Sequence, residues 1–326
     1  MEAPLKVENL KTYYETGAGS VRAVDGVDFT LDMGFSLGVV GESGCGKSTL
    51  GYSLINLVPP PGRIVGGRIL IDHEDITQLS EEELRRRIRW RKISMIFQEA
   101  MSSLNPFYTV GYQMAETLTV HKPELKGGEA EELVERSLRL VGLGSHVKDM
   151  YPHELSGGMR QRVVIAMGLL MEPEIVVADE PTTALDVIVQ ARIIELLKDL
   201  QARTGMSLIL ITHDLSIVSE LADYVAVMYA GRMAEYGTLE EICMNWRHPY
   251  THGLIASIPE LGARRPLEYI PGTPPDLRKP PAGCRFHPRC PYAVHQCEVE
   301  EPTGVEVEEG HYVWCHRAGE KLWRRR

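Results

Sequence analysis

One stretch of the sequence decides the fold: GESGCGKS, residues 41–48. It follows the apolar run Leu37–Val40, which predicts a buried strand, and precedes a helical spacing of leucines that ends at the prolines of residues 59–61. The stretch matches the pattern G-x-x-x-x-G-K-[ST] in the strand, loop and helix context that the pattern requires. In such a loop, backbone N–H groups and the positive end of a helix surround phosphate groups. The sequence therefore predicts a nucleotide site here.

The side chains of this loop have distinct expected roles. We expect Lys47 to contact the β- and γ-phosphates and Ser48 to bind Mg²⁺. Cys45 stands at a variable position of the loop, where a small filler is favoured over a reactive thiol. The residues expected to contact the nucleotide are Gly41, Ser43, Gly44, Cys45, Gly46, Lys47, Ser48 and Thr49.

Two carboxylates follow a second predicted strand. The apolar run Ile175–Ala178 ends at Asp179 and Glu180, and α/β sheets bind ligands at the carboxyl ends of their strands. Asp179 suits Mg²⁺, and Glu180 suits the attacking water. An acidic pair on the surface would explain these residues alone, but the phosphate-binding loop favours the catalytic interpretation.

Strands and helices alternate along the central part of the chain. Such alternation is typical of a wound α/β sheet. Helical periodicity dominates from Val110 to Met171, so we expect a mostly helical subdomain to interrupt the sheet. Residues 1–40 alternate in the manner of strands. The expected central strands are 93–97, 175–178 and 207–211, and the expected helix is 187–200.

Composition limits the classes of function. The chain has 326 residues, 44% of them hydrophobic, enough for one large core and a small added domain. A formal net charge of −10 argues against nucleic acid as a partner, so we interpret the arginines of the predicted helix 80–90 as a solvated face. The start, MEAPLKVENL, is no secretory signal, and the apolar run Val163–Met171 is far shorter than the roughly 20 residues of a membrane-spanning helix. We expect a cytosolic chain that does not cross a bilayer.

A second candidate anion site lies at residues 155–162, LSGGMRQR. A hydroxyl residue and two glycines open a predicted helix there, an arrangement that directs backbone N–H groups at phosphate. One chain with two anion sites suggests a site shared between subunits.

Together these motifs resemble the ATP-binding cassette (ABC) family over roughly residues 5–245. The family signature is LSGGQ, from which Met159 departs beyond the Ser-Gly-Gly nest, so we expect phosphate binding to be unaffected. Gln98 resembles the Q-loop of the family, residues 184–186 the D-loop, and His213 the switch histidine that senses the γ-phosphate. The resemblance implies Mg²⁺ ligands Ser48, Gln98 and Asp179, and catalytic residues Glu180, His213 and Gln98.

The resemblance also implies an α/β P-loop NTPase core with an N-terminal antiparallel β subdomain and a helical signature subdomain at about residues 99–170. Tyr14, with Tyr13 as the alternative, falls where the family places an aromatic ring on adenine. A head-to-tail dimer is implied, which closes when ATP is bound. In it, Lys47, Ser48, Asp179 and Glu180 of one subunit face Ser156, Gly157 and Gly158 of the other.

Further segments narrow the family. Non-transport ABC ATPases of DNA repair, chromosome structure or translation have long coiled coils or two cassettes in one chain, and this sequence has neither feature. Residues 102–106, 247–251 and 271–275 resemble the oligopeptide and dipeptide permease ATPases. That resemblance implies a peripheral subunit at the cytoplasmic face of the membrane. Its partners would be two permease subunits, a second ATPase subunit, identical or not, and an external solute-binding protein. Peptides are the favoured cargo; nickel complexes and oligosaccharides stay open.

Four of the six cysteines gather after the expected domain boundary at residue 245, in the C-terminal extension 246–326. Six cysteines in a reducing compartment favour thiols or metal ligands over disulfides. The spacing fits the C-x2–4-C pairs of structural zinc poorly, whereas four Cys ligands suit a [4Fe–4S] cluster, which ATPases of the resembled group carry. Zinc, and mixed ligation with His287, His295 or His316, stay as alternatives. Because the extension is far from the phosphate-binding loop along the chain, we expect loss of the metal to leave ATP binding intact. The four proposed ligands are Cys284, Cys290, Cys297 and Cys315.

Overall fold

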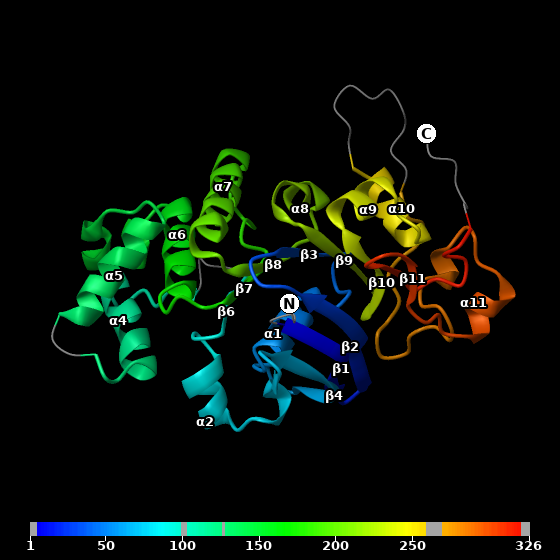
Figure 1. Ribbon diagram of the computed structural model, residues 1–326, viewed down its shortest axis with the longest axis horizontal. Helices are drawn as coiled ribbons and strands as arrows, with labels where there is room; N and C mark the ends of the chain where they lie inside the picture. The colour runs from blue at the N-terminus through cyan, green and yellow to red at the C-terminus, as the bar shows by residue number, and fades with distance from the viewer. Residues whose placement is uncertain (1–4, 99–102, 126–127, 259–268, 321–326) are drawn as a thin grey trace. The chain divides into compact units, whose positions relative to one another are not determined.

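A computed structural model describes residues 5–98, 103–125, 128–258 and 269–320 (Figure 1). The chain divides into two compact units. The first unit consists of Met1–Leu31, Ser36–Thr77 and Ile211–Arg326, and the second of Asp32–Phe35 and Gln78–Leu210.

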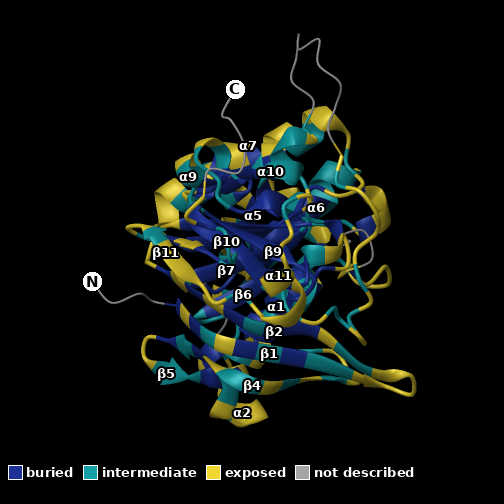
Figure 2. Cartoon of the chain, turned by 90° about the vertical axis from the view of Figure 1, so that its right-hand side faces the viewer, coloured by how far each residue is buried: buried dark blue, intermediate teal, exposed yellow. Residues whose placement is uncertain are grey.

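An antiparallel sheet forms one layer of the first unit. Val27, Phe29 and Leu31 are buried while Asp28 and Thr30 between them are exposed, so the period-2 pattern of the sequence gives this sheet one buried face. Figure 2 shows the resulting buried stretches along β1 and β2. The predicted N-terminal antiparallel β subdomain is confirmed. Its strands lie in the order β2 (Gly19–Leu31), β1 (Leu5–Thr16), β4 (Gly62–Ile71), β5 (Glu74–Asp75).

The second sheet of this unit contains the strand that precedes the phosphate-binding loop. This strand, β3 (Ser36–Val40), is buried at every residue and pairs in parallel with β9 (Tyr224–Tyr229). Continuous burial explains why its sequence is an apolar run rather than an alternation. The order from β3 continues through β9 to β10 (Arg232–Thr238), β12 (His311–Val313) and β11 (Val305–Glu308). The helices of this unit are α1 (Lys47–Leu54), α8 (Leu215–Leu221), α9 (Leu239–Met244), α10 (Pro249–Ala256) and α11 (His295–Val299).

The second unit combines parallel strands with a helical subdomain. Strands β6 (Ile93–Ile96) and β7 (Ile175–Asp179) pair in parallel, with Ile93 opposite Ile175, and β8 (Ser207–Ile211) lies next to β7. The strands predicted from the apolar runs are therefore confirmed, and the helix predicted at 187–200 extends to Thr204. Residues 99–102, where the predicted helical subdomain begins, lie outside the described residues. The main helices are α4 (Val110–His121), α5 (Glu129–Leu140), α6 (Gly157–Gly168) and α7 (Val187–Thr204).

The arginine-rich segment is helical, as predicted. It begins with α2 (Glu81–Glu83), which Ser80 and Glu83 close with a capping box, and continues as a π-helical turn, η2 (Leu84–Ile88). Arg86 forms an ion pair with Glu82, and both side chains are mostly exposed. Arg85, Arg86 and Arg87 are exposed and form the solvated face expected from the sequence, whereas the Arg89 side chain is only 11% exposed and pairs with Glu81.

The C-terminal extension is grouped with the first unit rather than set apart. Its strand β12 pairs with β10, with Tyr312 opposite Tyr236, so the extension lengthens the sheet. The extension also contains a short 3-10 turn, η5 (His287–Arg289), directly before Cys290. The domain boundary expected at residue 245 stays a prediction. Within the described ranges, the structure contains no helix with both the length and the apolar character needed to span a membrane.

Candidate nucleotide site

The phosphate-binding loop, residues 41–48, owes its path to glycines at two crowded positions. Gly46 has φ 105° and directly precedes α1, and a Cβ atom there would lie 1.9 Å from the carbonyl oxygen of Ala23. Gly41 has φ 152°, and its Cβ would lie 2.2 Å from the carbonyl oxygen of Met228. Only glycine fits either place. The loop thereby opens α1 with its N–H groups at the helix N-terminus, where an anion is stabilised.

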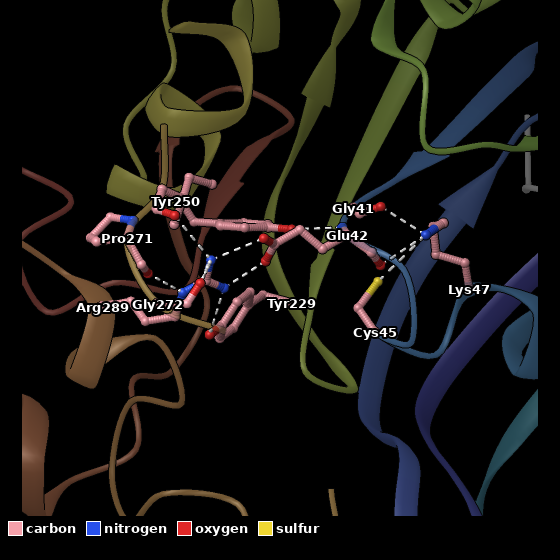
Figure 3. A network of polar contacts seen from close by, with 10 residues as sticks. Gly41, Glu42, Cys45, Lys47, Tyr229, Tyr250, Pro271, Gly272 and Arg289 are labelled. Atoms are coloured by element: carbon pink, nitrogen blue, oxygen red, sulfur yellow. Dashed lines mark hydrogen bonds and ion pairs between the residues drawn. The ribbon is translucent and has the colours of Figure 1, made fainter. Parts of the chain in front are cut away.

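Lys47 lies in the loop with its side chain largely buried. Its ammonium donates to the carbonyl oxygens of Gly41, at 2.7 Å, and Glu42, at 3.0 Å (Figure 3). These contacts hold the cation within the curl of the loop, where the predicted phosphate contact requires it. Cys45 is buried beside it, and burial raises the pKa of its thiol. A buried neutral thiol agrees with the predicted filler rather than a nucleophile.

The structure separates the two tyrosines that were candidates for the adenine contact. The hydroxyl of Tyr14 lies 3.5 Å from that of Thr49 in the first turn of α1. Tyr13 instead donates to a carboxylate oxygen of Asp25 at 2.6 Å. Burial and this hydrogen bond raise the pKa of Tyr13 to about 12. Of the two, Tyr14 lies beside the helix that follows the phosphate-binding loop.

The two predicted site carboxylates of the second unit, Asp179 and Glu180, lie where β7 ends. Asp179 is the last residue of β7 and is buried; Glu180 follows with φ 45°, a conformation that costs a residue with a Cβ about 1–3 kcal/mol. A carboxylate oxygen of Glu180 accepts from the Gln98 amide at 3.0 Å and from the Thr183 hydroxyl at 2.8 Å. Gln98 and Glu180 meet because the neighbouring parallel strands β6 and β7 end at the same edge. Thr183 was not predicted; no spacing rule marks it.

The signature segment opens α6 as predicted. Ser156 is the N-cap, and its hydroxyl accepts from the backbone N–H of Met159 at 3.3 Å. The backbone of Met159 thus completes the cap, whatever side chain stands there. A Cβ at Gly158 would lie 2.9 Å from a methyl group of Val189 on α7, and one at Gly157 would lie 3.6 Å from Leu185. Gly158 is therefore the crowded position of the first turn, whereas a Cβ at Gly157 would make an ordinary contact.

His213 is exposed and lies two residues after the end of β8, separated from the strand by Thr212. The turn around it is fixed by Asp214, whose N–H donates to the Thr212 hydroxyl at 3.1 Å and whose carboxylate caps α8 at Ser216. The predicted site residues are therefore divided between the units. The first contains Tyr14, residues 41–49 and His213, and the second contains Gln98, residues 156–158, Asp179 and Glu180.

The four cysteines of the extension line one small cavity of about 10 Å³, together with His287 and His316. All four cysteines are free thiols. Burial raises the pKa of Cys284, Cys290 and Cys315 to about 11. The backbone N–H of Arg317 lies 3.4 Å from the sulfur of Cys315. In the described part of the chain, no three His, Cys, Asp or Glu side chains are placed to hold one metal ion. His295, a predicted alternative ligand, is exposed and paired with Glu298.

A wound α/β sheet with this loop at the start of a helix defines a P-loop nucleotide-binding protein. Residues 24–183 match the family model of the ABC transporter, and residues 234–297 that of the oligopeptide/dipeptide transporter C-terminal region. The dipeptide transport ATP-binding protein DppD of Bacillus subtilis is 49% identical over 322 residues, which cover 97% of this chain and 95% of that protein. The oligopeptide transport ATP-binding protein OppD of Escherichia coli is 45% identical over 324 residues, which cover 98% of this chain and 95% of that protein.

The fold comparison agrees with these matches. The dimeric structure of MJ0796, a bacterial ABC transporter cassette, has a TM-score of 0.64 at 27% identity and covers 72% of this chain and 98% of that chain. A dimeric post-hydrolysis state of the same cassette, bound to ADP and Pi, has a TM-score of 0.63 over the same shares of the two chains. The chain belongs to the ATP-binding subunits of ABC transporters.

Proposed function

We propose that this subunit hydrolyses ATP to energise an importer of dipeptides and oligopeptides. The observation that carries this proposal is similarity along nearly the whole chain, C-terminal extension included, to ATP-binding proteins of dipeptide and oligopeptide transport. Its partners would be two permease subunits, a second ATPase subunit and an external solute-binding protein. The subunit would lie at the cytoplasmic face of the membrane, as a cassette at residues 1–245 followed by the extension 246–326.

In the nucleotide site, the proposed binding steps start from the first unit. The N–H groups at the start of α1 and the ammonium of Lys47 bind the β- and γ-phosphates, and Tyr14 stacks on adenine. Mg²⁺, when bound, neutralises charge that develops on the phosphates, and Ser48, Asp179 and Gln98 would hold it.

For the chemical step, we propose Glu180 as the group that orients and polarises the attacking water. The Gln98 and Thr183 contacts already fix its carboxylate at 3.0 and 2.8 Å, which supports a positioned base. His213 would contact the γ-phosphate. Chemistry of this kind rests on positioning and electrostatics more than on covalent steps.

The signature of a second subunit would complete the site. The first two residues of α6 are glycines without side chains, so Ser156, Gly157 and Gly158 could approach a phosphate held by another subunit. Because these contacts form to the γ-phosphate, ATP closes the dimer and hydrolysis opens it. That cycle couples ATP to a mechanical stroke.

Transport itself tests the cargo. The chain is co-expressed with the permease subunits that co-purify with it, reconstituted in vesicles, and supplied with solute-binding protein loaded with a dipeptide, an oligopeptide, a nickel complex or an oligosaccharide. We expect ATP-dependent uptake and stimulated hydrolysis with peptides only. Stimulation by nickel or oligosaccharide alone would contradict peptide import, and co-purification with DNA-repair or ribosomal proteins instead of permeases would contradict import altogether.

For the C-terminal extension, we propose a [4Fe–4S] cluster on Cys284, Cys290, Cys297 and Cys315. What supports the proposal is the donor set: four thiols, as Cys₄ ligation of a cubane requires, line one small cavity, and a backbone N–H lies at the sulfur of Cys315. In the described structure the thiols are not yet placed around one ion, so cluster binding would draw them together. The cluster would cross-link a segment with little core of its own and takes no part in hydrolysis, which transfers no electron.

Metal analysis tests this site. Anaerobic purification should give a brown protein with absorption near about 400 nm and about four irons per chain. Cys290→Ser should lose the colour, while Cys243→Ser, outside the cavity, should keep it. A colourless protein with one stoichiometric zinc would overturn the cluster in favour of the zinc alternative.

A further inference from the structure

Glu42, at a variable position of the phosphate-binding loop, has polar contacts at three of its groups (Figure 3). Its carbonyl oxygen accepts from Lys47, and its N–H donates to the Tyr250 hydroxyl at 2.8 Å. Its carboxylate accepts hydrogen bonds from both terminal nitrogens of Arg289, at 2.6 and 2.9 Å. Two of these partners lie after residue 245, so the extension contacts the loop directly.

Arg289 is itself fixed from several sides. Its side chain is only 5% exposed. Its Nε donates to the carbonyl oxygen of Pro271 at 2.7 Å, and one terminal nitrogen donates to the Tyr229 hydroxyl at 3.3 Å. A bidentate arginine with its remaining donors satisfied is a rigid support, because little side-chain freedom is left to lose.

Tyr250 is fixed in a different way. Its ring is fully buried and packs edge-on against Tyr229, with centroids 4.6 Å apart, and beside Phe286 at 5.4 Å. The hydroxyl is therefore held at the loop by the packing of the ring. Tyr250 and Pro271 belong to the segments 247–251 and 271–275, which no step of the proposed hydrolysis uses.

The negative charge of Glu42 explains why these contacts matter for a phosphate-binding loop. A carboxylate in a phosphate-binding loop repels an anionic ligand, and the Glu42 side chain is 25% exposed, so solvent screens its charge only in part. Arg289 neutralises that charge and holds it toward the extension. Tyr250 meanwhile fixes the peptide bond that precedes Glu42, and the carbonyl groups on both sides of Glu42's N–H contact Lys47.

We propose that Arg289 and Tyr250 are positioning residues through which the C-terminal extension sets the affinity of the phosphate-binding loop for ATP. This inference rests on the proposed role of the loop in ATP binding. It also replaces the expectation that distance along the chain makes the extension and the loop independent, because Arg289 immediately precedes the proposed cluster ligand Cys290.

The first test is ATP affinity of the purified full chain. Arg289→Ala should weaken ATP binding roughly 10- to 100-fold, the range for a lost hydrogen-bonded charge partner. Arg247→Ala is the matched control, since Arg247 is an ion-paired arginine of the same extension whose side chain donates to Glu308, which also accepts from Asn245, rather than to a residue of the loop. It should change ATP affinity less than about 2-fold.

A double variant separates positioning from general damage. If Arg289 acts by neutralising Glu42, Glu42→Gln should restore part of the affinity in the Arg289→Ala background, because the unpaired charge is removed. In the assembled complex, Arg289→Ala should raise KM for ATP with little change in kcat, since Arg289 touches no reacting atom. Unchanged ATP affinity in Arg289→Ala, or a double variant with the two losses simply added, would overturn the proposal.

Tyr250→Phe covers the case in which Arg289→Ala does not fold. It keeps the packed ring and loses one hydroxyl, so ATP binding should weaken about 2- to 10-fold. The control is Tyr236→Phe, which removes a hydroxyl that donates to the carbonyl oxygen of Thr30; it should leave ATP affinity unchanged. Equal affinities in the two phenylalanine variants would overturn the role of Tyr250. If Lys47→Ala loses ATP binding while the Arg289 and Tyr250 variants keep it, only this inference fails; if Lys47→Ala binds normally, the proposed function of the loop fails with it.

Discussion

Two helices, α1 and α6, begin in ways that suit phosphate binding, and the structures of their N-termini differ. At α1, the N-cap is Gly46 in a left-handed conformation, and no side chain caps the helix. At α6, the hydroxyl of Ser156 caps the helix by accepting from Met159. The loop before α1 is tied to the first unit through Tyr250, Arg289 and the backbone of Gly231, whereas the first turn of α6 is held against α7.

This difference matches two tasks. A loop that binds its own nucleotide needs uncapped N–H groups, a fixed cation and firm support, and α1 has all of these. A turn that approaches a nucleotide held elsewhere needs small residues and a preformed shape, which the cap and the glycines of α6 supply. One helix opening is therefore suited to capture ATP, and the other to recognise ATP that is already bound.

Glu180→Gln sharpens this comparison because it leaves both helix openings intact. Loss of a group that orients water should lower hydrolysis by the assembled complex roughly 10²- to 10⁴-fold. ATP binding should persist, and ATP-bound dimers should accumulate on size-exclusion chromatography. Hydrolysis at the parental rate would show that Glu180 is not the catalytic carboxylate. Glu172→Gln, an exposed acid paired with Arg136, is the control.

Ser156→Arg alters only the N-terminus of α6, and the phosphate-binding loop before α1 stays unchanged. Bulk and positive charge in the turn should prevent ATP-dependent closure, and removing such preorganised contacts to phosphate should lower turnover about 10²- to 10³-fold in a homodimeric complex. The isolated subunit should still bind ATP with parental affinity. In a heterodimer the loss should be partial, since the other subunit's signature still completes one site. Normal turnover in a homodimer would argue against a shared site.

Lys47→Ala alters only the N-terminus of α1, and the first turn of α6 stays unchanged. A buried ammonium contributes charge-assisted hydrogen bonds to phosphate, so ATP affinity of the isolated subunit should fall about 10- to 100-fold. Equilibrium binding of a fluorescent ATP analogue measures this. The opposite responses of Ser156→Arg and Lys47→Ala in the isolated subunit are the sharpest test of the division of tasks. Undiminished ATP binding in Lys47→Ala would contradict the proposed division of tasks between α1 and α6.

Much of the fold could be predicted because buried parallel strands leave a local signal. The runs at β3, β7 and β8 are apolar at nearly every residue and are bounded by polar segments, so their positions need no tertiary information. The π-helical turn after α2 and the sheet order beyond β10 leave no such signal. They depend on packing and on pairing between distant residues.

The same distinction applies to the site. The phosphate-binding loop combines glycines and a lysine at fixed spacing, so its geometry is written within eight residues. The supports of Glu42 could not be predicted, because Glu42 occupies a variable position and Arg289 lies 247 residues away along the chain. Thr183 was missed for a similar reason: a hydroxyl near a carboxylate becomes informative only once the turn after β7 is known.

The pairing of β12 with β10 has a consequence for the solubility of the chain. Without the extension, the residues Glu235 and Tyr236 would present unpaired backbone groups along a sheet edge, a template on which other chains can add as strands. With it, the sheet ends instead at β11, which has four residues, alternates valine with glutamate and is mostly exposed. A short, acidic final strand repels its own copies. The extension therefore protects the subunit from edge-to-edge aggregation while it waits for its permease partners.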